Sequence, residues 1–175
     1  VDGKLFDLTP QVLELGYSVL SSKGVWDIAR PFIDHFSEEI RESVSAAVLD
    51  RFDVVYVSGA QFHRVITVGI SVGARFPAHC TATGRVLLAS QPPEMWPGIL
   101  QNIPLAPMTD RTVTDRTAFR RVLEEVRDQG WSLVDQELEK GLMSVAVPLR
   151  DSAGRLVGAI NVGAPTVRMS PHDMV

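Results

Sequence analysis

The chain has 175 residues, of which 45% are hydrophobic and 22% charged, and its formal net charge is −4. These proportions suit a globular domain with a full-sized core and argue against a disordered chain. No apolar run reaches the roughly 18–20 residues that span a bilayer, and the start of the chain has no signal-peptide pattern. A net acidic chain without a concentrated basic face is a poor nucleic-acid binder by itself. The single cysteine excludes an intrachain disulfide and fits a reducing cytoplasm.

Two helices are predicted at the start of the chain. The first covers Pro10–Leu20, because a threonine precedes it as a cap and proline suits the first helical position. The second covers Val25–Arg41, and Pro31 in its second turn indicates a start nearer Arg30. The apolar positions that recur there at helical spacing are Ile28, Ala29, Phe32, Phe36 and Ile40.

The spacing of apolar residues then changes to the alternation that is typical of strands. Two β-rich runs, Ser43–Leu49 and Val54–Ser58, are separated by a short polar turn and predict an antiparallel hairpin. A third run, Arg64–Ser71, predicts a further strand, and Pro77 ends the strand pattern.

Helices and a loop are predicted in the middle of the chain. A short helix capped by Thr81 or Thr83 ends near Ala89, and another lies around 94–100. The stretch 102–112 holds two prolines and no clear period, so it reads as a surface loop.

The best-marked helix is Asp115–Gln129, which has an apolar stripe and ends at Gly130. Strands follow at Trp131–Asp135, Ser144–Arg150 and Arg155–Val162, and a tight turn joins the last two. The chain closes on Ser170-Pro171-His172-Asp173, a typical helix cap and first turn. Runs of strands with the helices set apart predict an α+β fold, an antiparallel sheet covered by helices.

Cys80 beside His79 raises the question of a nucleophile and its base. Adjacent residues of an extended segment point to opposite sides, which is poor geometry for proton transfer, so a small buried or pocket-lining thiol is favoured. A metal site through this pair and distant acids stays open, although the four histidines lack ligand spacing. No phosphate-binding glycine loop or nucleophile elbow is present, so neither a cofactor nor a catalytic residue is predicted.

The acidic segment 135–142 has two interpretations. It is either a solvated turn at the sheet edge, or it places Asp135 or Glu137 near a ligand. Asn161 lies within an otherwise apolar strand, where a buried amide without a hydrogen bond costs about 1–3 kcal/mol. A structural partner and a bound ligand are equally able to supply that bond.

Several stretches resemble the effector-binding domain of the IclR family of bacterial transcription regulators. They are Phe6–Gly16, Val54–Val57, Pro77–Ala89, Gly130–Ser132, Glu137–Leu142 and Ser144–Leu149. The resemblance implies a GAF-like fold, a curved antiparallel sheet of about six strands flanked by helices. It implies that residues 1–24 are a linker helix after an absent winged helix-turn-helix domain, and that 25–175 are the effector-binding domain with a truncated last helix.

The resemblance also implies a function. Family members change their DNA affinity when a small metabolite binds to this domain, and DNA is contacted only by the separate N-terminal domain. They are cytoplasmic homodimers or tetramers without a membrane segment. The Val-Asp-Gln-Glu-Leu-Glu segment that begins at Val134 looks like the branch that controls aromatic-acid catabolism through the β-ketoadipate pathway. Hydroxybenzoate, protocatechuate or β-ketoadipate is the effector that this branch implies.

The family's pocket positions fall on Ala82, Thr83, Ser144, Asn161 and Gly163. The family's aspartate falls on Val134, with Asp135 one place later, and this departure counts against a glyoxylate- or pyruvate-type ligand.

An acid also needs a cation or N–H donors in an apolar cleft. Arg75, Arg85 and the backbone N–H groups near Thr83 are candidates, and His79 and Cys80 complete the candidate ligand-binding residues. Two other functions stay open. One is an enzyme that uses Cys80 and His79, and the other is a pure dimerisation module whose pocket is filled by side chains.

Overall fold

The computed structural model describes residues 24–64 and 69–175, so the helix predicted at 10–20 lies outside the described residues. In chain order the elements are α2 (Val25–Ile40), β1 (Ser43–Asp50), β2 (Asp53–Ala60), β3 (Arg75–Pro77), the 3₁₀ turn η1 (Ala78–Cys80), α3 (Ala82–Ala89), η2 (Pro93–Met95), α4 (Trp96–Asn102), α5 (Arg116–Gln129), β4 (Ser132–Asp135), β5 (Leu142–Arg150), β6 (Leu156–Pro165) and α6 (Pro171–Met174).

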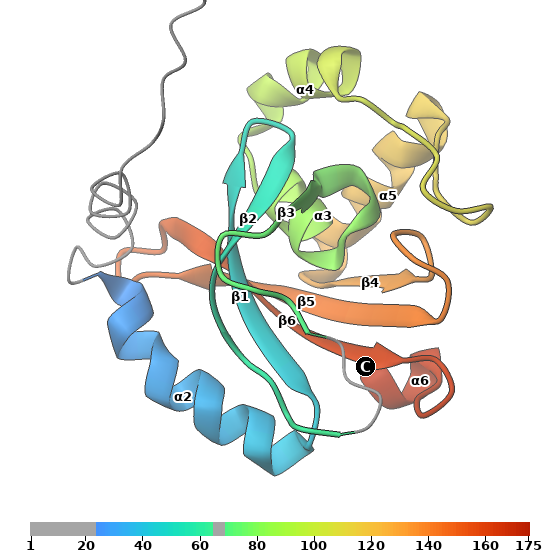
Figure 1. Ribbon diagram of the computed structural model, residues 1–175. Coiled ribbons are helices and arrows are strands. Elements are labelled where there is room, and N and C mark those ends of the chain that lie inside the picture. The colour runs from blue at the N-terminus through green and yellow to red at the C-terminus, as the bar shows by residue number, and fades with distance from the viewer. Residues whose placement is uncertain (1–23, 65–68) are drawn as a thin grey trace, which may run out of the picture.

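The strands form one six-stranded sheet in the order β3-β2-β1-β6-β5-β4, and every neighbouring pair is antiparallel. The sheet curves between two helical layers (Figure 1). Helix α2 lies on one face, and α3 lies on the other with α5 packed beyond it. The predicted α+β fold of about six antiparallel strands flanked by helices is therefore confirmed.

Helix α2 begins at Val25 with Pro31 inside it, so the suggested start near Arg30 is wrong. The proline removes one backbone donor, whose acceptor in an unbroken helix is the carbonyl group of Asp27. Asp27 is exposed, so water can satisfy that carbonyl group and the helix tolerates the proline.

Helix α2 has apolar residues on two faces. Ile33 is buried against the sheet with Ala29 and Ile40 packed in the same cluster, and Ser37 is buried as well, whereas Ile28 and Phe32 are 71% and 72% exposed. Phe36 is 41% exposed. These three residues, which were among the predicted apolar positions, form an uncovered stripe on the described structure.

The predicted hairpin of β1 and β2 is confirmed, with Asp50 paired to Asp53 across its turn. The prediction of a strand over 64–71 fails in its described residues, Arg64 and 69–71, which are not in a strand. The edge strand is β3 instead, which pairs with β2 over three residues after a turn at Gly73 with φ of +86°. Only a glycine adopts that φ without strain.

Helix α3 is held close to the preceding 3₁₀ turn. The Thr81 hydroxyl, one of the two predicted caps, accepts from the Gly84 N–H group at 3.2 Å, and Thr83 lies inside the helix. A Cβ atom on Gly84 would lie 2.2 Å from the carbonyl oxygen of Ala78, so only glycine allows this approach. All eight residues of α3 are buried, and Leu87 and Leu88 join Phe119 and Leu123 of α5 in the main core.

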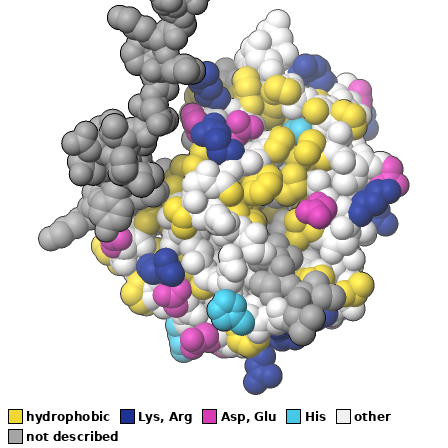
Figure 2. Space-filling view, viewed as in Figure 1, with side chains coloured by type: hydrophobic (Ala, Val, Ile, Leu, Met, Phe, Trp, Pro, Cys, Tyr) yellow, Lys and Arg dark blue, Asp and Glu magenta, His cyan; other side chains and the backbone are white. Residues whose placement is uncertain are grey.

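The two faces of β6 pack in different layers, one beneath α2 and the other beneath α3. Ile160 and Val162 pack in the cluster beneath α2, whereas Ala159 belongs to the core beneath α3. Alternation along the strand therefore places Asn161 and Gly163 on the α3 side. Hydrophobic side chains gather on the molecular face near β3 and α3, with charged side chains around them (Figure 2).

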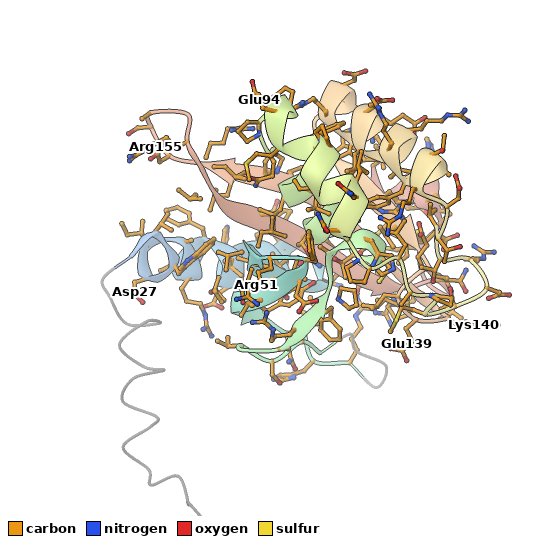
Figure 3. All side chains as sticks on the ribbon, turned by 90° about the horizontal axis from the view of Figure 1, so that it is seen from above. Asp27, Arg51, Glu94, Glu139, Lys140 and Arg155 are labelled. Carbon is orange, nitrogen blue, oxygen red and sulfur yellow. The ribbon has the colours of Figure 1, made fainter. Side chains whose placement is uncertain are left out.

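The long loop between α4 and α5 and the capped helix α6 also match the predictions. Asp115 caps α5, and Gly130 ends it with φ of +83°. The Asp151–Gly154 turn between β5 and β6 projects from the molecule, with Arg155 beside it (Figure 3). None of the helices in the described ranges is long and apolar enough to cross a membrane.

Candidate functional site

A small, largely enclosed cavity lies between the sheet and the start of α3. Its lining residues are Tyr56, Ile70, Cys80, Thr81, Val134, Leu138, Leu142, Ser144, Asn161 and Gly163. The space among these side chains is about 20 Å³, which is about the room that one water molecule needs. Four of the predicted ligand-binding residues, namely Cys80, Ser144, Asn161 and Gly163, therefore meet at one place.

The register of the sheet explains why this space exists. Val134, Ser144 and Gly163 lie directly opposite one another on β4, β5 and β6. The two small residues leave a gap that larger side chains would fill. Asn161 is two residues from Gly163 on the same face of β6, between Ser45 of β1 and Ala146 of β5.

The amide group of Asn161 is buried without a complete set of partners. The residue is 4% exposed, and its Oδ1 atom has no hydrogen-bond partner among the described residues. Such an atom destabilises the fold by about 1–3 kcal/mol. An amide presents an acceptor oxygen on one side and two donor hydrogens on the other. The oxygen without a partner can therefore accept a hydrogen bond from a hydroxyl group within this cavity.

One residue at the start of α3, the N-cap Thr81, lines the cavity, whereas the predicted residues Ala82 and Thr83 do not. The N–H groups of Ala82 and Thr83, in the first turn of the helix, have no acceptor within the helix. Both residues are buried, which strengthens the attraction of such a helix end for an anion. The Tyr56 hydroxyl lies 3.4 Å from the Thr83 hydroxyl, and burial raises the pKa of Tyr56.

His79 and Cys80 point to different neighbours. The Nε2 atom of His79 lies 2.9 Å from the Ala106 carbonyl oxygen, and its ring contacts Phe119 edge to face. Burial lowers the pKa of His79 and raises the pKa of the Cys80 thiol to about 11. The thiol donates to the Pro77 carbonyl oxygen at 3.6 Å. Because a nucleophilic cysteine needs a lowered pKa, this pair is not built for covalent catalysis.

Arg85 makes structural contacts and does not line the cavity. Its Nη2 atom lies 2.6 Å from Glu137 Oε2, and its Nε atom donates to the His79 carbonyl oxygen at 2.8 Å. Glu137 also accepts from the Val113 N–H group at 3.0 Å. Glu137 is buried, so the interpretation of the acidic segment as a solvated turn is wrong at this position.

Arg75 and Asp135 lie away from the cavity lining. Arg75 sits on edge strand β3, 2.7 Å from Asp50 and 3.4 Å from Asp53, and is about half exposed. Asp135 pairs with Arg111, on the opposite face of β4 from the cavity-lining Val134. Across 24–64 and 69–175, no three His, Cys, Asp or Glu side chains are grouped to hold a metal ion.

Sequence reasoning missed part of the apolar lining, namely Tyr56, Ile70, Leu138 and Leu142. Tyr56 lay within a stretch interpreted only as a core strand, and its hydroxyl was the available signal. Leu138 and Leu142 lay within the segment 135–142, which was interpreted from its acidic residues. The signal that could have marked them is the pair of leucines four residues apart.

Comparisons with known proteins identify the family to which the chain belongs. Residues 17–174 match the family model described as bacterial transcriptional regulator IclR C-terminal. The Pca regulon regulatory protein of Pseudomonas putida is 38% identical over 174 residues, which are 99% of this chain and 60% of the relative. The chain thus spans less than two thirds of that relative's length.

Two solved structures are also similar. An IclR homologue from Microbacterium hydrocarbonoxydans in complex with 4-hydroxybenzoate has a TM-score of 0.82 and 25% identity, over 95% of this chain and 69% of that one. The inducer-binding domain of a double mutant of Acinetobacter PobR, in complex with 3-hydroxybenzoic acid, has a TM-score of 0.79 and 29% identity, over 84% of this chain and 86% of that one. With the family model covering most of its length, the chain belongs to the family of bacterial transcriptional regulator IclR C-terminal domains.

Proposed function

We propose that residues 25–175 are the effector-sensing domain of an IclR-type transcription regulator, and that the cavity beside α3 binds a small aromatic acid or β-keto acid. Residues 1–24 link this domain to a winged helix-turn-helix domain outside the chain. The effector changes the DNA affinity of that separate domain, in the cytoplasm. The curated relatives are named as regulators of gene expression, not as enzymes.

The observation that carries the proposal is the buried Oδ1 atom of Asn161, which has no hydrogen-bond partner among the described residues and lies in a cavity that Thr81, the N-cap of α3, also lines. A carboxylate at the helix start satisfies the N–H groups of Ala82 and Thr83. A hydroxyl group at the other end of the effector donates to Asn161 Oδ1, and Ser144 and Gly163 lie beside it. An aromatic hydroxy acid carries both kinds of group on one small ring.

Two similar structures support the aromatic acid over the β-keto acid. Both contain a hydroxybenzoate, and one relative is named as the p-hydroxybenzoate hydroxylase transcriptional activator of Acinetobacter baylyi. That relative is 32% identical over 99% of this chain.

The uncovered stripe of α2 supports self-association. Ile28, Phe32 and Phe36 form a row of exposed apolar side chains at helical spacing. Exposed apolar groups of this kind gain free energy when a second surface covers them. We therefore propose a homodimer or tetramer in which this stripe is covered.

Calorimetric titration with 4-hydroxybenzoate, protocatechuate and β-ketoadipate tests the effector proposal. We expect saturable binding of at least one acid and a matching rise in melting temperature. Benzyl alcohol, which has the ring without the acid, is the control and should not bind. A folded sample that binds none of the acids would contradict the proposal and favour the dimerisation module.

A further inference from the structure

A second hollow adjoins the cavity on its outer side. This outer groove has a volume of about 540 Å³, and its lining includes Phe76, Met108, Leu138, Leu142 and Pro165. Ile70, Leu138 and Leu142 line both the inner cavity and the outer groove. Three apolar side chains therefore stand between the polar groups around Asn161 and the surface.

The inner cavity alone is too small for an aromatic effector. Its free space is about 20 Å³, whereas an engineered protein cavity that binds benzene measures about 150 Å³. An aromatic acid that reaches Asn161 must therefore place much of its ring where the dividing side chains now stand. The added space on their far side is lined mostly by apolar residues, with Glu139 and Lys140 among them, and suits a ring that carries a polar group.

Of the three dividing residues, Ile70 and Leu138 lie outside the strands. Leu142 lies in β5 and is paired with Pro165 of β6, whereas Leu138 belongs to the β4–β5 loop, and all three are half buried. The backbone before Leu138 is fixed, because Thr112 donates to the Glu137 carbonyl oxygen at 2.7 Å. A change of side-chain rotamer at Leu138 thus joins the two spaces without unfolding the loop.

The charged residues that follow Leu138 do not block this route. Glu139 and Lys140 lie at the outer edge of the molecule on the tip of the same loop (Figure 3). Lys140 pairs with Asp110 at 3.1 Å, and both side chains are largely exposed. Glu139 and Lys140 are exposed and line the groove together with the apolar residues.

We infer that the inner cavity and the outer groove are two compartments of one binding site, and that Leu138 sets the size of the ring that the site accepts. The inner compartment holds the polar groups of the acid, and the outer one holds the part of the ring that passes Leu138. This inference rests on the proposed function, since the acid is the proposed effector.

The test uses Leu138→Ala and compares a one-ring with a two-ring acid, 4-hydroxybenzoate and 6-hydroxy-2-naphthoate. The variant should bind the naphthoate at least about tenfold more tightly than the unchanged chain, since a few carbon atoms in an apolar pocket are worth roughly 10–200-fold in discrimination. Leu133→Ala is the matched control, because Leu133 is also half buried but lines neither hollow. Equal naphthoate affinities in all three proteins would overturn the inference.

Indole, an uncharged probe, separates this inference from the proposed function. Indole should bind to Leu138→Ala more tightly than to the unchanged chain, even if no acid binds. If the acids bind but Leu138→Ala binds indole and naphthoate no more tightly than the unchanged chain does, the effector proposal stands and the role of Leu138 is overturned. If Leu138→Ala does not fold, Leu138→Trp serves instead. It should fill the passage and weaken 4-hydroxybenzoate binding, and an unchanged affinity would overturn the inference.

Discussion

Arg85 and Glu137 are 52 positions apart in the chain, yet their side chains form a buried ion pair with 2.6 Å between Nη2 and Oε2. The pair joins α3, whose N-cap Thr81 lines the cavity, to the β4–β5 loop that carries Leu138. Both walls of the candidate site therefore depend on one contact.

Arg85→Ala should lower the free energy of unfolding by about 3–5 kcal/mol, because it leaves the Glu137 carboxylate buried without its partner. Urea denaturation measures the loss. Arg120→Ala, which breaks the exposed pair with Glu124 on α5, is the control and should change stability little. The double variant Arg85→Met with Glu137→Leu should be more stable than Arg85→Ala. A double variant as unstable as the single one would show that the charges themselves are needed.

The free energy of unfolding should fall as the pH rises from 9 to 11, partly because of Cys80. The thiol has a pKa of about 11 in the folded chain against an ordinary value of 9.0. Between these values the unfolded chain loses the proton first, so stability is complete below pH 9 and is lost as the pH approaches 11. Urea titrations across this range should show a shallower fall of stability for Cys80→Ala. Some fall should remain, because burial raises the pKa of Tyr56 as well. Identical slopes of stability against pH in the unchanged chain and in Cys80→Ala would contradict the raised pKa of the Cys80 thiol.

Asn161→Leu should stabilise the fold and impair the site. It removes the unpaired buried oxygen, so the free energy of unfolding should rise by about 1–3 kcal/mol. The same change should weaken the binding of the acid found by calorimetry, since the cavity loses its amide. Asn102→Leu on α4 is the control, because Asn102 is exposed and remote from the cavity. A variant with unchanged acid affinity would remove Asn161 from the binding site.

Gly84→Ala should be strongly destabilising. The new Cβ atom would meet the Ala78 carbonyl oxygen at 2.2 Å, and such overpacking costs about 1–3 kcal/mol or more. Gly98→Ala on α4 makes the same substitution with no atom within 4 Å, and should stabilise the chain by roughly 0.5–1 kcal/mol. Thermal unfolding of both variants measures the contrast. Similar melting temperatures would mean that α3 is not held against η1.

Phe32→Ser should reduce self-association without unfolding the protomer, because Phe32 is largely exposed on the stripe of α2. Sedimentation velocity over a concentration series measures association, and urea denaturation measures stability. Ile33→Ser on the neighbouring, buried face should instead destabilise the protomer. An unchanged sedimentation coefficient for Phe32→Ser would show that the stripe is not the contact surface.

Elements with local signals could be predicted from the sequence. Both ends of helix α5 are determined by residues next to them. The Asp115 carboxylate accepts from the Ala118 N–H group at 2.7 Å, and Gly130 ends the helix. The turn before β6 is likewise closed by Asp151 accepting from Ala153 and Arg155 N–H groups. Such contacts span only a few residues, so composition and spacing reveal them.

Elements that depend on distant partners could not be predicted in the same way. The apolar alternation of 64–71 suggested a strand, but the edge strand is set by pairing of β2 with Arg75–Pro77. The partner of Glu137 is 52 positions away, and nothing near it in the sequence distinguishes it from a solvated acid. Asn161 could be marked as unusual within its strand, but whether its amide has a partner depends on packing that spacing does not encode.

The alternation along β6 has a consequence for folding fidelity. A slip of the strand by one residue would turn Ile160 and Val162 toward α3 and place Asn161 in the apolar layer beneath α2. There the amide would lie among hydrocarbon side chains such as Ile33, away from the cavity that Thr81 lines. The residue proposed to recognise the effector thus also makes the misaligned sheet unfavourable. Its replacement by leucine would remove a safeguard against register error as well as a ligand contact.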